Sequence, residues 1–425
     1  MKLLCAADLH LGRVPARLPG DLKLDGSALG PAAAWHALVA RARRERPAAL
    51  LLAGDVVDDP RDAYEAYADL AAGVEALHGD GIPVLAVAGN HDVEVLPRLA
   101  DEVPGLRLLG RGGRWEAAVL EEDGRTVRVV GWSFPQPQVA ASPLTGGLEA
   151  ALRDLPPGPT VGLLHADLDA SSSRYAPVRR AELDGAPVEA WLLGHVHAPS
   201  VLAGPRPTGY LGALSPADPG EPGVHGAWRL TLTDGEPQIA RVSVAPLRYD
   251  TLEVALDGLD RPGDALARVV AALRTHASRV ADGALRAASV RLVLTGRVDR
   301  PEAVRRALLE EDPRDARVEV DGVHVAVDGW EARLRPPVEL AALARSDDPV
   351  GIAARTLLTV REGDADARAA LVDAGRERFG EVDRRGPFAA LAAHERTDAD
   401  VAARLERAAE RVLETLLAQR GDEAP

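Results

Sequence analysis

Cysteine and long apolar runs are what this sequence most clearly lacks. It has one cysteine, Cys5, so no disulfide can form within the chain, which is typical of proteins in a reducing cytoplasm. No apolar run reaches the roughly 18 residues that a membrane-spanning helix needs. The apolar run from Leu3 to Ala7 continues directly into Asp8, so we interpret it as a buried strand and not as a cleaved leader. We therefore expect a cytoplasmic protein without a membrane partner.

Lysine is almost absent, and the chain as a whole is acidic. Lysine occurs only at Lys2 and Lys23, so arginine carries nearly all of the positive charge, and the net charge is −15. This charge fits a nucleic-acid enzyme poorly, because phosphate backbones attract basic surfaces. Arginines do cluster within residues 41–46 and 174–180. These clusters are either solvated faces or DNA contacts, and if DNA binds we expect a partner to supply part of the basic surface.

The sequence pattern changes twice along the 425 residues, which predicts three regions. Residues 1–246 alternate apolar runs with helical patterns and predict a layered α/β domain. Residues 247–335 predict a small α/β cap domain. Residues 336–425 have helical periodicity, and their last helix, about 398–420, either folds back on its own domain or docks on a partner protein.

Several elements of the first region can be placed from apolar runs and periodicity. Strands are predicted at 2–7, 48–53, 84–88, 127–132, 160–164 and 190–193, and helices at 32–46 and 63–78. Two stretches rich in proline and glycine, 133–147 and 204–226, are predicted to be long surface loops.

Five short motifs in the first region carry side chains that can bind a metal ion or a phosphate. Most of them directly follow a predicted strand, so their side chains are expected along one edge of a sheet. The motifs are Asp8-Leu9-His10, Gly54-Asp55, Gly89-Asn90-His91-Asp92, His165 and Gly194-His195-Val196-His197.

This set of side chains suits a pair of metal ions. Two metals about 3.5–4 Å apart can clamp a phosphate diester and activate a hydroxide between them, given one bridging carboxylate with imidazole and oxygen ligands. Asp55 is the natural bridge, because the glycine before it permits a sharp turn. Asp8 and His10 lie two residues apart in an extended segment and can point the same way, as can His195 and His197.

Each motif alone has an ordinary structural interpretation. A single histidine such as His165 is more often a buried core residue than a ligand, and Asp8-Leu9-His10 alone is compatible with a helix-capping turn. Gly89-Asn90 alone is a common turn dipeptide, although Asn90 also offers an uncharged oxygen ligand. The occurrence of all five motifs in this order, beside strand-like runs, favours a metal site.

Together the motifs resemble those of the calcineurin-like metallophosphoesterase superfamily. The resemblance implies an α/β fold of four layers, in which two packed sheets are flanked by helices. It also implies that Asp8, His10, Asp55 and His197 hold one divalent metal, and that Asp55, Asn90, His165 and His195 hold a second. His91 would contact the phosphate and protonate the leaving oxygen, and Asp92 would orient His91. Manganese is the expected metal, with iron or zinc as alternatives.

Within this superfamily the sequence is most similar to SbcD-type DNA repair exonucleases, including their YhaO-like branch. The similarity extends to Gly54–Asp58 and to two segments after the last motif, Tyr210–Ser215 and Gly220–Gly223. It implies manganese-dependent exonuclease and endonuclease activity on DNA. It further implies a large coiled-coil ATPase partner of the SbcC or YhaN type, with contact expected at the C-terminal helices, and a homodimer formed through helices 32–46 or 63–78.

Two other functions are compatible with the motifs. One is a phosphatase or phosphodiesterase acting on small molecules or phosphoproteins. Phosphoprotein phosphatases of the superfamily carry Asp-Arg-Gly where this chain has Asp58-Asp59-Pro60, and Glu where it has Asp92, so both positions argue against that subclass. The other is a catalytically silent subunit that binds DNA ends, which the complete ligand set disfavours.

Overall fold

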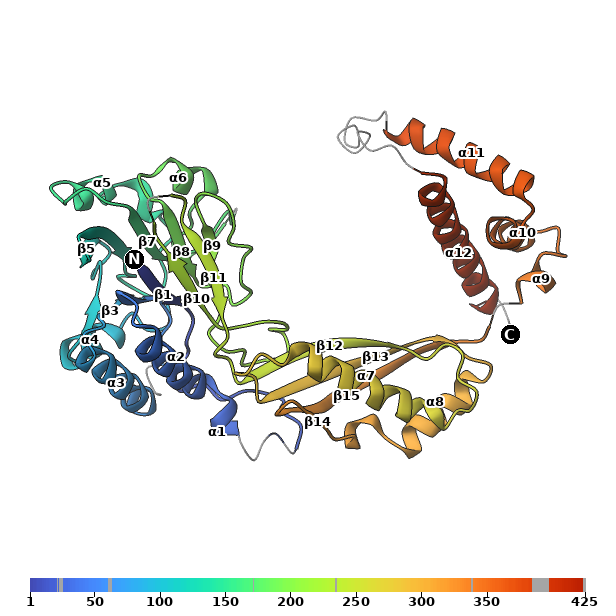
Figure 1. Cartoon of the computed structure of the whole chain (residues 1–425), viewed down its shortest axis with the longest axis horizontal. Coiled ribbons are helices and arrows are strands. Elements are labelled where there is room, and N and C mark those ends of the chain that lie inside the picture. The colour runs from blue at the N-terminus through green and yellow to red at the C-terminus, as the bar shows by residue number, and fades with distance from the viewer. Residues whose placement is uncertain are drawn as a thin grey trace. The chain divides into compact units, whose positions relative to one another are not determined.

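The computed structural model describes residues 1–20, 22, 26–59, 63–170, 172–233, 235–337, 339–383 and 397–422. The chain divides into two compact units, Met1–Leu334 and Arg335–Pro425 (Figure 1). The predicted regions 1–246 and 247–335 both lie within the first unit, and the three-region division stays a prediction.

Two β-sheets form the centre of the first 246 residues. Strands β1, β2 and β3 run parallel to one another in the first sheet, and β6, β7, β8 and β9 run parallel in the second. The first sheet has the order β11 (Gln238–Val242), β10 (Ala227–Thr231), β1 (Lys2–Ala6), β2 (Ala49–Ala53), β3 (Val84–Val87) and β4 (Leu106–Leu108). The second has the order β5 (Trp115–Glu122), β6 (Arg125–Trp132), β7 (Thr160–His165), β8 (Ala190–Gly194) and β9 (Thr208–Tyr210).

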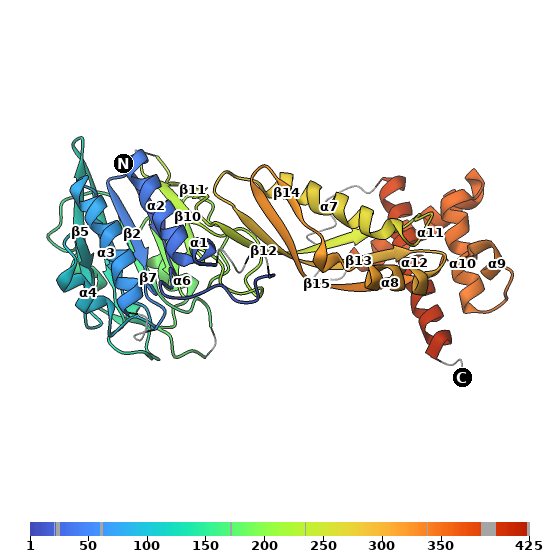
Figure 2. The same cartoon turned by 90° about the horizontal axis from the view of Figure 1, so that it is seen from below.

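Three hydrophobic cores join these sheets and their helices into four layers (Figures 1 and 2). One core lies between the first sheet and α2 (Pro31–Glu45), α3 (Ala63–Gly79) and α4 (Leu96–Glu102). The second lies between the two sheets, and the third between the second sheet and α5 (Leu148–Leu152) and α6 (Arg180–Gly185). The predicted four-layer α/β fold is therefore confirmed.

Alternate residues of β1 and β2 supply different cores, which explains their continuous apolar sequences. Leu4 and Leu50 pack toward the helices, whereas Leu3 and Leu51 pack toward the second sheet. A strand that is buried on both faces cannot carry the polar alternation of a half-exposed strand. On α2, Trp35, Leu38 and Ala42 recur at three- and four-residue spacing and form its buried face.

The carboxyl ends of the parallel strands place the motifs at one edge of the two sheets. Asp8 follows β1, Asp55 follows β2 and Asn90 follows β3 in the first sheet. His165 ends β7 and His195 follows β8 in the second. The two edges touch, because a Cβ added to Gly194 would lie 2.1 Å from the Ala53 carbonyl oxygen.

The cap contains one four-stranded sheet covered by helices. Within this sheet β14 (Val318–Val320) and β15 (Val323–Arg335) form an antiparallel hairpin across Asp321-Gly322, both of which have a positive φ, as tight two-residue hairpin turns require. The elements are β12 (Leu247–Ala255), α7 (Asp264–Val280), β13 (Ala287–Arg297), α8 (Pro301–Glu310), β14 (Val318–Val320) and β15 (Val323–Arg335), in the sheet order β12-β13-β15-β14.

The second unit is helical over its described residues. Val401 and Leu413 on the last helix are buried within the unit, against residues of the preceding helices, so one face of that helix folds back on its own unit. The helices are α9 (Leu340–Leu343), α10 (Pro349–Glu362), α11 (Ala365–Asp383) and α12 (Asp398–Asp422). The parts of the predicted region at 338, 384–396 and 423–425 lie outside the described residues. No helix among the described residues is long and apolar enough to cross a bilayer.

Candidate metal centre

The loops after the strands hold strained residues that can act as metal ligands. Asp8, His10, Asp55 and His195 all have a positive φ, between 48° and 104°, although none is glycine. Such backbone conformations cost about 1–3 kcal/mol each and cluster at functional sites. Asp8, His10 and Asp55 are also buried, where an unpaired charge is unfavourable. The fold therefore keeps these side chains in place at a cost to its stability.

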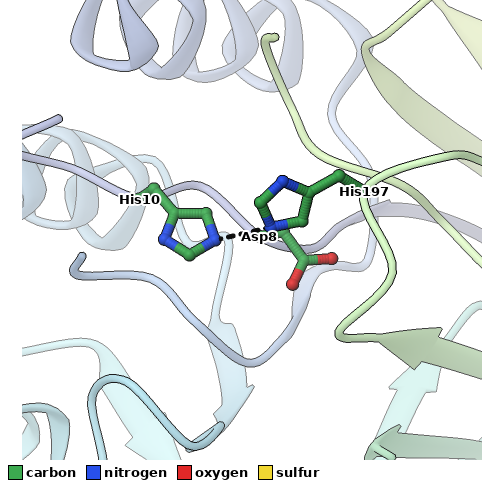
Figure 3. Close-up of side chains that lie close together, drawn as sticks. All are labelled: Asp8, His10 and His197. Carbon is green, nitrogen blue, oxygen red and sulfur yellow. Dashed lines mark hydrogen bonds between the residues drawn. The ribbon is translucent and has the colours of Figure 1, made fainter. Parts of the chain in front are cut away.

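One group of potential ligands combines Asp8, His10 and His197. Their ligand atoms all lie within 4.8 Å of one another. The Nε2 atoms of His10 and His197 face each other at 3.0 Å (Figure 3). The Asp8 carboxylate also accepts a hydrogen bond of 2.9 Å from the main-chain N–H of His195, which fixes the first motif against the last.

A second group combines Asp55, Asn90, His165 and His195. His165 Nε2 lies 3.2 Å from Asp55 Oδ2 and 3.1 Å from Asn90 Oδ1. His195 Nδ1 lies 3.1 Å from the same Asn90 oxygen. Asp8, Asp55 and His165 also have ligand atoms within 4.8 Å of one another, so the two groups are contiguous. The structure thus brings all seven predicted metal-binding residues into one cluster.

Each of the four histidines has its other ring nitrogen beside an oxygen atom. His10 Nδ1 lies 2.7 Å from Asp58 Oδ1, and His197 Nδ1 is hydrogen bonded to Glu221 Oε1 at 2.7 Å. The remaining two contacts are His195 Nε2 to Asp167 Oδ1 at 3.2 Å and His165 Nδ1 to the Ala53 carbonyl oxygen at 3.1 Å. A proton on these outer nitrogens leaves a lone pair on each nitrogen that faces the cluster.

The donor set fits divalent cations. Facing lone pairs repel, as at the 3.0 Å separation of the His10 and His197 nitrogens, unless a positive charge lies near them. Burial lowers the pKa of His165, but the adjacent Asp55 carboxylate outweighs it and raises that pKa to about 9. Burial disfavours ionised Asp55 too, but His165 holds the pKa of Asp55 below its usual range. The cluster therefore favours positive charge, and its mixed imidazole and oxygen donors suit manganese, iron or zinc.

Two glycines allow the ligands to come this close. A Cβ on Gly89 would lie 2.1 Å from Asp55 Oδ1, and a Cβ on Gly54 would lie 2.5 Å from His165 Nδ1. Gly54 also has a φ of +90°. A larger residue at either position would displace a candidate ligand.

His91 lies at the exposed rim of the cluster. Its main-chain N–H donates a 3.0 Å hydrogen bond to Asp55 Oδ1, and its ring lies 5.3 Å from that of His10. Its Nδ1 lies 2.9 Å from the Asp58 carbonyl oxygen, which can only accept a hydrogen bond. Nδ1 therefore carries a proton, and Nε2 is the nitrogen left for a substrate.

The predicted role of Asp92 in orienting His91 stays a prediction, and the contacts that the structure shows for Asp92 are with the main chain. The buried Asp92 carboxylate accepts hydrogen bonds from the main-chain N–H groups of Val56 at 2.7 Å and Gly89 at 2.8 Å. It fastens the Asp55 loop to the Asn90 loop, and the Asp58 carbonyl holds the His91 ring. Burial and the nearby Asp55 charge raise the pKa of Asp92 to about 7.

The sequence motifs did not single out Asp58, Asp167 and Glu221 as parts of this site. Asp58 and Glu221 lie in segments that carry the family resemblance, and Asp167 follows His165 by two residues, so both can face the same side of an extended chain. Burial disfavours ionised Glu221, but hydrogen bonds from His197 and Ala217 outweigh it and lower the pKa of Glu221 to about 2.

The comparison with known families agrees with this geometry. Residues 1–199 match the calcineurin-like phosphoesterase family. This first part of the chain therefore matches a calcineurin-like phosphoesterase domain, the superfamily that the five motifs resemble. Members of this family use divalent metal ions, and the clustered side chains above are those that can hold them.

Two relatives each match about half of the chain. The DNA double-strand break repair protein Mre11 of Aeropyrum pernix is 32% identical over 231 residues, which are 51% of this chain and 54% of that protein. The uncharacterized metallophosphoesterase YhaO of Bacillus subtilis is 27% identical over 204 residues, 47% of this chain and 49% of that protein. The chain thus spans about half the length of the curated relatives it matches.

Among solved structures, the calcineurin-like phosphoesterase YfkN of Bacillus subtilis is similar to this chain, and the alignment covers 57% of this chain and 88% of the YfkN chain. Its sequence identity is 13% and its TM-score is 0.37.

Proposed function

We propose that this protein is a metal-dependent DNA nuclease with exonuclease activity that acts in DNA repair and uses two divalent metal ions. The observation that carries the proposal is the convergence of seven oxygen and nitrogen donors at the edge of two sheets. DNA as the substrate is supported by the similarity to the Mre11 repair protein of Aeropyrum pernix. The single, buried Cys5 is compatible with work in the cytoplasm.

In this proposal Asp8, His10, Asp55 and His197 hold one metal, and Asp55, Asn90, His165 and His195 hold the other. Asp55 is the shared ligand, because its carboxylate is close both to Asp8 and to His165. A pair of divalent ions there, most simply Mn²⁺, would offset the charge of a phosphodiester and lower the pKa of a water molecule.

His91 is the proposed proton donor to the leaving oxygen. It is exposed at the rim, where a phosphodiester can reach it, and the Asp58 carbonyl fixes its Nδ1 proton. A second proton, on Nε2, would then be free to pass to the oxygen that leaves the phosphorus. Asp92 supports this step only indirectly, by holding the two loops that carry Asp55 and His91.

A basic groove offers a place for nucleic acid despite the net charge of −15. The groove has a volume of about 680 Å³ and lies between α2, the end of β11 and the loop before β13. Small side chains, such as Ala37, keep it open, and Asp282 is the only carboxylate among its lining residues. Its four arginines are Arg41, Arg44, Arg241 and Arg286. Phosphates are the expected ligands of such a surface.

The arginines of this groove differ in how strongly they are paired. Arg41 forms an ion pair with Glu45, and Arg241 stacks on Trp228 at 4.6 Å. The side chains of Arg44 and Arg286 have no ion-pair partner among the described residues. These two cations are therefore the ones most available to phosphate.

Two protein partners are part of the proposal. A large coiled-coil ATPase of the SbcC or YhaN type would contact the helical unit, where Ile352 on α10 and Val412 on α12 are exposed apolar residues. A homodimer would form through α2 or α3, and α3 exposes Tyr64 and Tyr67. Exposed apolar and aromatic side chains of this kind favour protein contacts.

The test is manganese-dependent digestion of end-labelled duplex DNA by the wild type and by His91→Asn, with metal content measured on both. We expect cleavage by the wild type only, with equal metal in both, because the main-chain N–H of His91 that contacts Asp55 is unchanged. Hydrolysis of a chromogenic diester without DNA cleavage would favour a small-molecule phosphodiesterase. A fully metal-loaded wild type that is inactive on both substrates, also with an ATPase partner added, would indicate a silent DNA-end-binding subunit.

A further inference from the structure

Glu221 lies outside the candidate ligand set and yet makes a short contact to one of its members, His197. Its Oε1 is hydrogen bonded to His197 Nδ1 at 2.7 Å, and its Oε2 accepts a hydrogen bond of 2.8 Å from the Ala217 N–H. Arg13, three residues after His10, lies 3.9 Å from Oε1. Both carboxylate oxygens therefore have defined partners, and the carboxylate has little freedom to turn away from His197.

A buried histidine connects Glu221 back to the main chain near His197, and its neutral ring can donate a hydrogen bond to one of the two carbonyl oxygens that it contacts. The Nε2 of buried His225 lies 3.1 Å from the Glu221 carbonyl oxygen, and its Nδ1 lies 3.1 Å from the Ala213 carbonyl oxygen. The Ala213 N–H donates in turn to the His197 carbonyl oxygen at 3.0 Å. The path from the His197 ring through Glu221, His225 and Ala213 thus returns to the His197 main chain.

The segment that carries Glu221 is also fastened to the first strand of the cap. The Gly223 N–H donates to the Tyr249 carbonyl oxygen on β12 at 2.8 Å. The Tyr249 hydroxyl donates to the Ala16 carbonyl oxygen at 2.6 Å, and the Ala16 N–H donates to the Ala217 carbonyl oxygen at 2.8 Å. The cap strand therefore supports the segment 217–223 from two sides.

We infer that Glu221 is a positioning residue that holds His197 with Nδ1 protonated and Nε2 directed at the metal cluster. A carboxylate behind a ligating histidine fixes the tautomer and the ring orientation, and it makes the metal-facing nitrogen more basic. The inference rests on the proposed metal site. It adds a residue from the segment between the last motif and the cap, and it makes metal affinity depend on how the cap holds that segment.

The test is titration of the full-length protein with Mn²⁺, with free Mn²⁺ measured by electron paramagnetic resonance. The wild type should bind two ions. Glu221→Ala should bind one of them about 10–100-fold more weakly, the usual effect of removing an outer partner of a ligand, with the other unchanged. Glu221→Gln should lose less, because its amide oxygen can still accept from Nδ1 but brings no charge. Glu236→Ala, on an exposed turn, is the matched control.

A double-mutant cycle separates positioning from a general structural effect. In a His197→Ala background, Glu221→Ala should cause no further loss of Mn²⁺ affinity, because the residue acts through His197. Glu221→Gln should still unfold cooperatively in the absence of metal, at a thermal midpoint below that of the wild type, because the folded protein stabilises the ionised carboxylate through its hydrogen bonds. Wild-type affinity in Glu221→Ala, or losses that add in the double variant, would overturn the role of Glu221 alone. A wild type that binds no Mn²⁺ would instead overturn the proposed metal site, and the positioning role with it.

Discussion

The two ring nitrogens of each histidine in the candidate metal centre have different surroundings. In each of the four histidines, one ring nitrogen faces the cluster and the other faces an oxygen atom of Asp58, Glu221, Asp167 or Ala53. A neutral imidazole carries one proton, so an oxygen on one side leaves a lone pair on the other. When the imidazoles are neutral, the outer oxygens therefore leave lone pairs that face the cluster, and His165 must lose a proton before it can bind a cation.

His165 should make the stability of the metal-free protein depend on pH. Although burial lowers its pKa, the Asp55 carboxylate raises it to about 9, above the ordinary 6.5. Protonation of His165 thus stabilises the folded state fully below pH 6.5, and this stabilisation is lost as the pH rises to about 9. We expect the thermal midpoint in chelator to fall across this interval, and His165→Gln to reduce the fall.

The same proton competes with metal ions for His165. The affinity of the wild type for Mn²⁺ should therefore increase as the pH rises from 6.5 to about 9, the interval in which the metal-free protein loses stability. An affinity that is constant from pH 6.5 to about 9 would contradict the proton competition at this ring.

Among the elements, the parallel strands decide which residues meet. β1, β2 and β3 end at the same edge of one sheet, and β7 and β8 end at the facing edge of the other. Their loops must then pass one another within a few ångströms, which only small residues permit. The glycines that precede the ligands are part of the site for this steric reason.

Gly89→Ala tests the packing of these loops. The new Cβ would fall 2.1 Å from Asp55 Oδ1, so the carboxylate shared by the two proposed metals must move. We expect loss of Mn²⁺ binding and of phosphodiester hydrolysis, measured by metal titration and with a chromogenic diester. Gly79→Ala is the control, because a Cβ there meets nothing within 4 Å. Normal metal binding by Gly89→Ala would show that Asp55 is not held where the structure places it.

Several elements of the fold were predictable because their cause is local. The helix predicted at 32–46 is α2 at Pro31–Glu45, and the strand predicted at 84–88 is β3 at Val84–Val87. The stretch 204–226 was predicted to be a surface loop, and that prediction was wrong. It contains β9, and Leu211 and Leu214 within it are buried. Some of its prolines and glycines, such as Pro205 and Gly220, are exposed, whereas others, such as Gly209 and Pro216, are buried.

At the scale of the whole molecule, charge is distributed unevenly. The net charge is −15, yet four arginines and one aspartate line the groove between α2 and the loop before β13. Arg43 and Arg46, from the same sequence cluster as Arg44, are both paired with Asp80. The cluster at 41–46 is therefore divided by the fold, with part of it used in ion pairs and part of it facing the groove.

The groove predicts a specific change in DNA binding. The double variant Arg44→Ala/Arg286→Ala should bind duplex DNA more weakly than the wild type. The slope of log affinity against log salt should also become shallower by about 1–2, because a protein that contacts fewer phosphates releases fewer counterions from the DNA. Fluorescence anisotropy in chelator measures binding without cleavage. Hydrolysis of a chromogenic diester by the same variant should be unchanged.

The matched control is Arg153→Ala/Arg274→Ala, which removes two exposed arginines outside the groove with no ion-pair partner among the described residues. Equal salt slopes for the two double variants would mean that the groove has no special role in binding DNA.

The sequence by itself was enough to predict the candidate donor residues, their order along the chain and the matching family, because each motif is contiguous and most follow a strand whose apolar run can be recognised locally. Only the tertiary structure decided which ring nitrogens face inward, that Asp92 fastens two loops, and that Glu221 stands behind His197. The physical reason is distance along the chain. His10 and His197 are 187 residues apart in the sequence and 3.0 Å apart at their ring nitrogens, and no local pattern encodes that contact.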